Sequence, residues 1–93
     1  MLALPTKMKN SLKAKAHHLK PVITIGNNGV TENVIAETER ALYDHELIKV
    51  KIHSNEKAER VEIIEDICNQ TNAANINLVG KIGTIYKPST KNS

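Results

Sequence analysis

The clearest pattern in the chain lies at residues 47–53, where three β-branched apolar residues alternate with two lysines and a histidine. A period of two is typical of a β-strand with one buried face. Residues 22–25 form a shorter β-branched run between a proline and a glycine, which predicts a buried strand. Residues 76–79 and 82–87 predict two further strands, joined by Gly80-Lys81 as a two-residue hairpin turn.

Three other segments have apolar residues at helical spacing. We expect the first helix over residues 6–20, with Thr6 as N-cap and a proline at position 21 that prevents its continuation. The second should follow an N-cap at Thr31 and end near residue 45. The third should begin at residue 54 or 55 and end near residue 71.

The first predicted helix carries two neighbouring stripes. Met8, Leu12 and Leu19 share one side of a helical projection, and we expect them to be buried. A basic stripe runs directly beside the apolar one and consists of Lys9, Lys13 and Lys20, with His17 at its edge. A partner could therefore contact both this helix and whatever lies next to it.

The element order is helix-strand-helix-strand-helix-strand-strand. Strand-helix-strand steps favour parallel neighbours, whereas a hairpin adds antiparallel ones. We therefore expect an α/β (α+β) two-layer fold, in which helices pack on a four-stranded mixed sheet. Since 93 residues leave no room for a second core, residues 1–88 should form one domain and residues 89–93 a disordered polar tail.

Composition and charge restrict the kinds of partner that the chain can bind. Tyr43 and Tyr86 are the chain's only aromatic residues, so the sequence lacks the aromatic cluster with which RRM and cold-shock domains stack bases. A nucleic acid would instead be held through its backbone. All ten carboxylates lie within residues 26–70, whereas residues 1–25 carry five lysines and no acid. Such an uneven distribution produces a local field at a partner surface.

The sequence contains no set of residues typical of a catalytic site. Cys68 is the single cysteine, which excludes an intramolecular disulfide, and its place on an apolar helical row predicts a small core residue. His17 and His18 point about 100° apart on a helix, so we expect them at the surface rather than on a metal. With no nucleophile and base, metal set or nucleotide loop, we expect no enzyme, cofactor or small-molecule substrate. No apolar run suits a membrane span, which predicts a cytoplasmic protein.

Gly26-Asn27-Asn28-Gly29 stands between a predicted strand and a predicted helix. Glycines permit positive φ and close approach, and a helix start presents unpaired N–H groups with partial positive charge, so such a loop can bind phosphate. Lys20 precedes the strand and could reach the same region. A GxxG pattern alone is a weak indication, because an ordinary turn also requires glycines.

Several stretches together are more specific, and through them the chain resembles the bacterial YhbY-type RNA-binding proteins, whose domain is also called the CRM domain. In chain order they are AHHLKP at 16–21, IGNNGVTE at 25–32, HELIKVKI at 45–52, VGK at 79–81 and IYKPS at 85–89. The chain departs from the family pattern at Gly83, where a larger apolar residue is usual. It also has Lys87 where arginine is common, and a shortened basic tail.

The resemblance implies a fold like the C-terminal domain of translation initiation factor three. It also implies a monomer that binds ribosomal RNA in precursors of the large ribosomal subunit. The first helix, the loop and the final hairpin would then share one basic surface. The expected RNA-binding residues are Gly26, Asn27, Asn28, Gly29, Thr31, Lys9, Lys13, Lys20, Lys81 and Lys87.

Two other functions stay open on the sequence alone. An assembly adaptor could bind a ribosomal protein or factor through its acidic helices without touching RNA. The same fold could also bind DNA in a chromatin-type role. Lys49 and Lys51 share one strand face, which could either contact RNA or simply face solvent.

Overall fold

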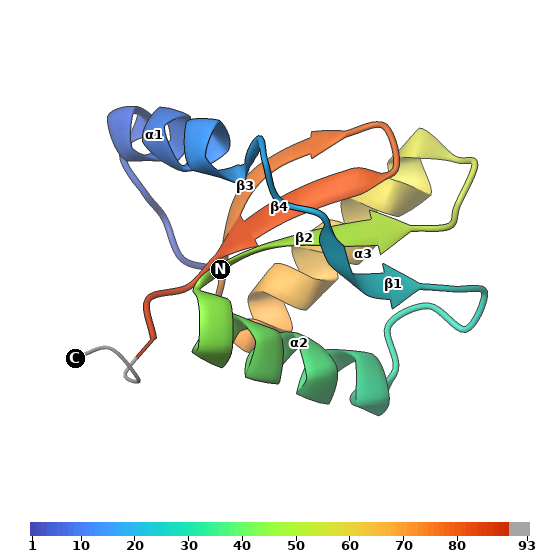
Figure 1. The fold of residues 1–93 in the computed structure, drawn as a ribbon. Helices are drawn as coiled ribbons and strands as arrows, with labels where there is room; N and C mark the ends of the chain where they lie inside the picture. The colour runs from blue at the N-terminus through green and yellow to red at the C-terminus, as the bar shows by residue number, and fades with distance from the viewer. Residues whose placement is uncertain (90–93) are drawn as a thin grey trace.

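Three helices and four strands follow one another along residues 1–89, the part of the chain that the computed structural model describes (Figure 1). The predicted order of elements is confirmed. The bounds are α1 (Thr6–Ala16), β1 (Pro21–Ile25), α2 (Glu32–His45), β2 (Leu47–Ile52), α3 (Lys57–Thr71), β3 (Ala74–Val79) and β4 (Ile82–Tyr86).

The strands form one mixed sheet in the order β1-β2-β4-β3. β1 and β2 are parallel because α2 carries the chain back between them, and β4 runs antiparallel to both β2 and β3. The predicted four-stranded mixed sheet is therefore confirmed. β1 and β3 are its two edges.

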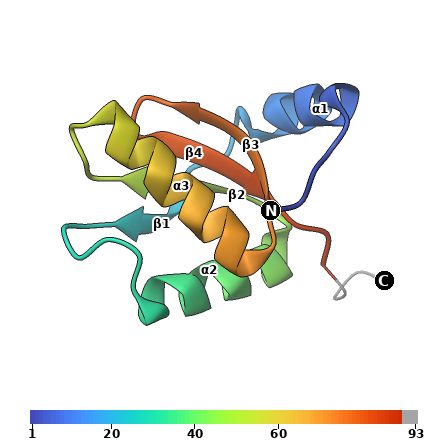
Figure 2. The ribbon, with the colours of Figure 1, turned by 180° about the vertical axis from the view of Figure 1, so that it is seen from behind.

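The main core lies between one face of the sheet and the helices α2 and α3. The alternation predicted for β2 is confirmed, because Ile48, Val50 and Ile52 are all buried on this face. Figure 2 shows α3 crossing this side of the sheet. The buried residues that join them are Ile23, Ile25, Leu42, Ile64, Ile67, Cys68, Ala73 and Ile85.

Gly83 on β4 makes close packing of α3 possible. A Cβ atom at this position would lie 2.7 Å from Cδ1 and 3.1 Å from Cγ1 of the buried Ile64. The volume that a larger strand residue would occupy is therefore filled by an isoleucine from the helix. This contact accounts for glycine at position 83.

α1 packs on the opposite face of the sheet and covers only one end of it. Its Leu12 forms a small second cluster with Ala74 and Ile76 of β3, against which Leu47 and Tyr86 pack in part. No helix within residues 1–89 covers the remainder of this face. Thr24 and Lys51, which lie side by side in the β1–β2 register, are both exposed there.

The first helix is shorter than predicted. It ends at Ala16 rather than Lys20, and Pro5, not Thr6, stands at its N-cap. The Leu19 N–H donates to the Ala16 carbonyl (2.9 Å) as the chain turns away to reach β1. Leu19 therefore leaves the apolar stripe, and the prediction that Met8 and Leu19 are buried is wrong.

Two other boundaries also differ from the prediction. β1 is not fully buried, because it is an edge strand and only Ile23 and Ile25 point into the core. α3 begins at Lys57 rather than at residue 54 or 55, because Ser54 Oγ accepts the N–H of Glu56 (3.2 Å) and forms a turn before the helix. Both differences come from local contacts that the apolar spacing does not encode.

The end of the described chain is held against α2. The Ser89 N–H donates to the Glu46 carboxylate (2.7 Å), and Ser89 Oγ donates to the Tyr43 carbonyl (2.6 Å). The sequence predicted Ser89 to belong to a disordered tail, whereas the structure holds it by these two hydrogen bonds. The rest of that predicted tail, residues 90–93, lies outside the described residues. No helix within residues 1–89 is long and apolar enough to cross a membrane.

Candidate nucleic-acid interface

The Gly26–Gly29 loop follows β1, and two further residues, Val30 and Thr31, lead from it into α2 (Figure 1). The Gly29 N–H donates to the Gly26 carbonyl (3.1 Å) and closes the turn. Gly29 has φ +68°, a conformation that favours glycine, whereas Gly26 has no such φ and a Cβ atom there would meet nothing within 4 Å. The two glycines therefore meet different requirements, and space is left open around Gly26.

The start of α2 is capped as predicted. Thr31 Oγ1 accepts the Val34 N–H (3.1 Å), and the Thr31 carbonyl accepts the Ile35 N–H (3.0 Å). Thr31 thus fixes the helix start, and its hydroxyl hydrogen can still be donated. No acceptor within residues 1–89 takes the backbone N–H groups of Asn27, Asn28, Glu32 and Asn33. Unpaired backbone donors at a helix start are suited to an anion.

Carboxylates distinguish the two sides of the loop. The hollow on the helix side is lined by Gly26–Gly29, Thr31 and Val34, with no acidic residue. The hollow on the other side, next to the chain that follows β2, includes Glu56 and Glu59. A phosphate is therefore favoured on the helix side, although Glu32 in the first turn of α2 lies nearby.

Two lysines of β2 lie on the open face of the sheet, in a row that ends near this loop. Lys51 pairs in register with Thr24, two residues before Gly26. Lys49 lies farther back along the same face and lines a hollow with Lys13 and His17 of α1. The sequence left the orientation of Lys49 and Lys51 open, and the structure places both on the side that carries α1.

Lys81 lies at the same end of the sheet as the loop. Its carbonyl accepts the Ile52 N–H (2.8 Å), which joins the hairpin turn to the end of β2. The next residue, His53, donates its N–H to the Ile25 carbonyl (3.0 Å), immediately before the loop. The loop and the hairpin turn therefore flank the end of β2.

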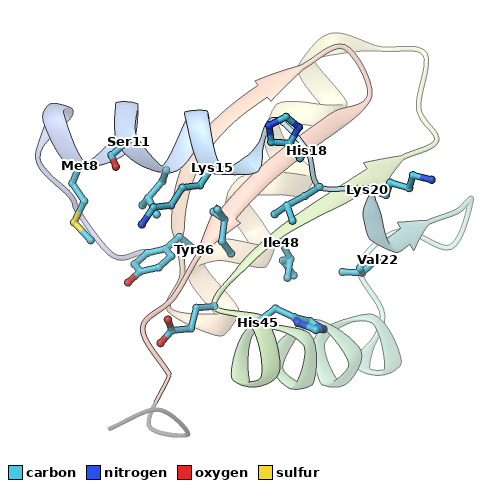
Figure 3. A pocket seen from close by; sticks show the side chains of 13 residues that line it. Met8, Ser11, Lys15, His18, Lys20, Val22, His45, Ile48 and Tyr86 are labelled. Carbon is cyan, nitrogen blue, oxygen red and sulfur yellow. The ribbon is translucent and has the colours of Figure 1, made fainter.

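The structure does not bring Lys9, Lys20 and Lys87 to the loop. Lys20 stands before β1, and the five residues of this strand separate it from Gly26 by about 20 Å, six steps of roughly 3.3 Å. Its side chain points outward in Figure 3. Lys9 is half-buried on α1, and Lys87 lines a hollow with Arg40 and Tyr43 of α2. Apolar spacing could not place these lysines, because their positions depend on how the strands are ordered.

Cys68 is buried in the main core, as predicted. Burial raises the pKa of its thiol to about 12, so it is protonated at neutral pH and cannot act as a thiolate. Within residues 1–89, no three His, Cys, Asp or Glu side chains are grouped so that they could hold a metal ion.

Comparison with known proteins places this geometry in a family. A protein of Haemophilus influenzae named RNA-binding protein is 47% identical over 89 residues, which cover 96% of this chain and 90% of the relative. A protein of Pseudomonas aeruginosa named a probable RNA-binding protein is 41% identical over 90 residues, covering 97% and 86% of the two chains.

A solved structure agrees with the fold. The solution structure of a hypothetical protein from Staphylococcus aureus, for which RNA binding is proposed, superposes with a TM-score of 0.86. It shares 31% sequence identity, and the match covers 98% of this chain and 95% of the other. The CRS1/YhbY (CRM) domain model matches residues 4–87. The resemblance predicted from the sequence is therefore confirmed, and the chain belongs to the CRS1/YhbY (CRM) domain family.

Proposed function

We propose that this protein binds structured RNA through the RNA backbone, with the Gly26–Gly29 loop and the start of α2 holding a phosphate. The observation that carries the proposal is the set of unpaired backbone N–H groups in this segment, next to a sheet face that bears lysines. Family membership and the names of the two relatives support RNA as the partner. The protein acts without catalysis or a cofactor.

The RNA backbone follows a track from α1 across the open sheet face to the loop. Lys13, Lys49 and Lys51 neutralise successive phosphates along it, and Lys81 contributes at the hairpin turn. Asn27 and Asn28 add short side-chain amides that can donate without crowding the backbone. We define these residues, together with Gly26, Gly29 and Thr31, as the RNA track.

Acidic side chains on the other layer orient the complex. Eight of the ten carboxylates belong to α2 and α3, the helices that cover the opposite face of the sheet. They repel RNA from that side. Lys9, Lys20 and Lys87 lie outside the RNA track and act through the long-range field rather than by direct contact.

The natural target is ribosomal RNA in precursors of the large ribosomal subunit, bound by a monomer in the cytoplasm. This choice rests on the resemblance to YhbY-type proteins. Backbone recognition suits such a target, because folded ribosomal RNA presents phosphates at defined spacings while most of its bases are paired. The protein carries few aromatic residues with which to stack unpaired bases.

The substitution Asn27→Asp with Asn28→Asp tests the phosphate site. Two negative charges where a phosphate lies should lower the affinity for a large-subunit ribosomal RNA transcript at least tenfold in filter binding. The thermal midpoint should not fall, because acidic groups are favourable near a helix N-terminus.

A matched control adds the same two charges at Asn69 and Asn72, which are exposed at the far end of α3. This variant should bind RNA like the parent. Equal affinity of the loop variant and the parent would contradict the proposed site. Purified protein and RNA alone suffice for the assay, so binding also rules against an adaptor that needs a protein partner.

A further inference from the structure

We infer that a groove beside α1 binds an acidic, apolar segment of a partner protein, separately from RNA. The groove has a volume of about 700 Å³ and lies between α1, the start of β1 and the C-terminal end of α2 (Figure 3). Its size is within the usual range of binding pockets, roughly 300–1,000 Å³. We call it the α1 groove.

Six of the thirteen residues that line the α1 groove are aliphatic, and three of these six are exposed. Met8, Leu19 and Val22 are 38%, 37% and 54% exposed, and they are three of the six large hydrophobic side chains exposed within residues 1–89. Figure 3 shows Met8, Val22 and Tyr86 around one hollow. Exposed apolar residues gathered in one concavity mark a binding site more often than scattered ones do.

The rim of the groove is basic. Lys15 of α1 and Lys20, which immediately precedes β1, give the rim two positive charges, and His18 and His45 lie beside them. The one carboxylate in the lining, Glu46, already accepts the Ser89 N–H (2.7 Å). The rim therefore complements a segment in which Asp or Glu residues flank the apolar side chains.

The lining favours a protein segment over RNA. Nucleobases bind by stacking on flat aromatic groups, and the lining has one tyrosine and two histidines against six aliphatic side chains. Aliphatic walls instead fit two or three leucine-sized side chains, as in a helix bound in a groove. A second copy that paired groove to groove would bring the same basic rim and be repelled. The tail Thr90-Lys91-Asn92-Ser93 has no apolar side chain with which to fill the groove.

α1 separates the groove from the RNA track. Lys13 and His17 line the hollow over the open sheet face, whereas Ser11 and Lys15 line the groove on the other side of the same helix. Both partners can therefore bind one molecule at the same time. Such an arrangement would let the protein connect an acidic protein segment to RNA.

Selection of phage-displayed random 16-residue peptides on the full chain tests the inference. We expect enriched sequences with large aliphatic residues at helical spacing, flanked by Asp or Glu. A synthetic peptide from this set should bind in fluorescence anisotropy, and a copy with lysine in place of each acid should not. On ¹⁵N-labelled protein, its chemical-shift changes should cluster around the α1 groove.

Paired variants locate the site. Val22→Glu should weaken the selected peptide at least tenfold, and so should Lys15→Glu with Lys20→Glu. Val79→Glu is the control for the first, because Val79 is an exposed valine on the other edge strand, 69% exposed. Lys7→Glu controls for charge on α1, since Lys7 is exposed and lies outside the groove lining. Thermal melting confirms that each variant is folded.

Three results would overturn the inference. The first is failure of the peptide test. Either the selection yields no acidic, aliphatic sequences, or the selected peptides bind Val22→Glu as tightly as they bind the parent. The second is a loss of RNA affinity in Val22→Glu but not in Lys7→Gln, which lowers the net charge by the same amount outside both hollows, and this result would assign the groove to RNA. The third is a dimer in sedimentation that Val22→Glu dissociates, which would assign it to a second copy.

Discussion

Alanine substitutions at Gly26 and Gly29 test how closely RNA approaches the loop. Gly26→Ala adds a methyl group that meets no protein atom within 4 Å, so the stability should not fall. The RNA affinity should nevertheless drop about tenfold if a phosphate lies against the loop backbone. Filter binding and thermal melting measure the two quantities.

Gly29→Ala is the contrasting variant. At φ +68°, alanine is strained, and we expect a loss of about 1 kcal/mol in the free energy of unfolding together with the loss of affinity. Unchanged RNA affinity in Gly26→Ala would mean that the RNA backbone does not approach the first glycine.

Cys68 should make stability depend on pH in the alkaline range. The thiol pKa is raised from 9.0 to about 12 by burial, so the folded state keeps the proton that the unfolded state releases above pH 9. The stability contribution is fully present below pH 9 and is lost as the pH rises towards 12. At pH 10.5 the loss should be about 2 kcal/mol relative to pH 8.

Urea unfolding of the parent and of Cys68→Ala at both pH values isolates this contribution. Cys68→Ala should be less stable at pH 8, because it leaves a small cavity, but should lose less stability on going to pH 10.5. The same pH dependence in the two proteins would show that Cys68 does not titrate in this way.

At the scale of single elements, the β2 strand and α1 supply the lysines of the RNA track. Each phosphate contact that is lost should reduce the slope of log affinity against log salt by about 0.7–0.9. Lys13→Gln and Lys51→Gln should each show this reduction. Lys87→Gln should leave the slope almost unchanged, because Lys87 lies in the hollow beside Arg40 and Tyr43.

Salt titrations of the three variants with one RNA transcript measure these slopes. A reduction for Lys87→Gln as large as that for Lys51→Gln would extend the interface to the α2 side. It would also restore the broader basic surface that the family resemblance implies.

Elements with strong local signals could be predicted from the sequence. The alternation in β2, the Thr31 cap of α2 and the Gly80-Lys81 turn all lie where their residues indicate. The end of α1 could not be predicted, because nothing before Pro21 marks where the helix leaves the sheet. Burial of β1 could not be predicted either, since a short β-branched run does not reveal that the strand lies at an edge.

At the scale of the whole molecule, the sheet separates a lysine-bearing face from two acidic helices. The sequence predicted the loop, the helix cap and the basic first helix. The strand order and register decided which lysines join them, and these depend on long-range pairing. The sequence therefore left the orientation of Lys49 and Lys51 open. It also could not show that Lys20 and Lys87 lie away from the loop.

The most direct test of the central claim is a titration of ¹⁵N-labelled protein with a large-subunit ribosomal RNA fragment, followed by amide chemical shifts. The account predicts the largest changes at the N–H groups of Asn27, Asn28, Glu32 and Asn33, with further changes at Lys49 and Lys51. The chemical shifts of amides at the far end of α3 should not change. Changes confined to the exposed faces of α2 and α3, with none in the Gly26–Gly29 loop, would contradict the account.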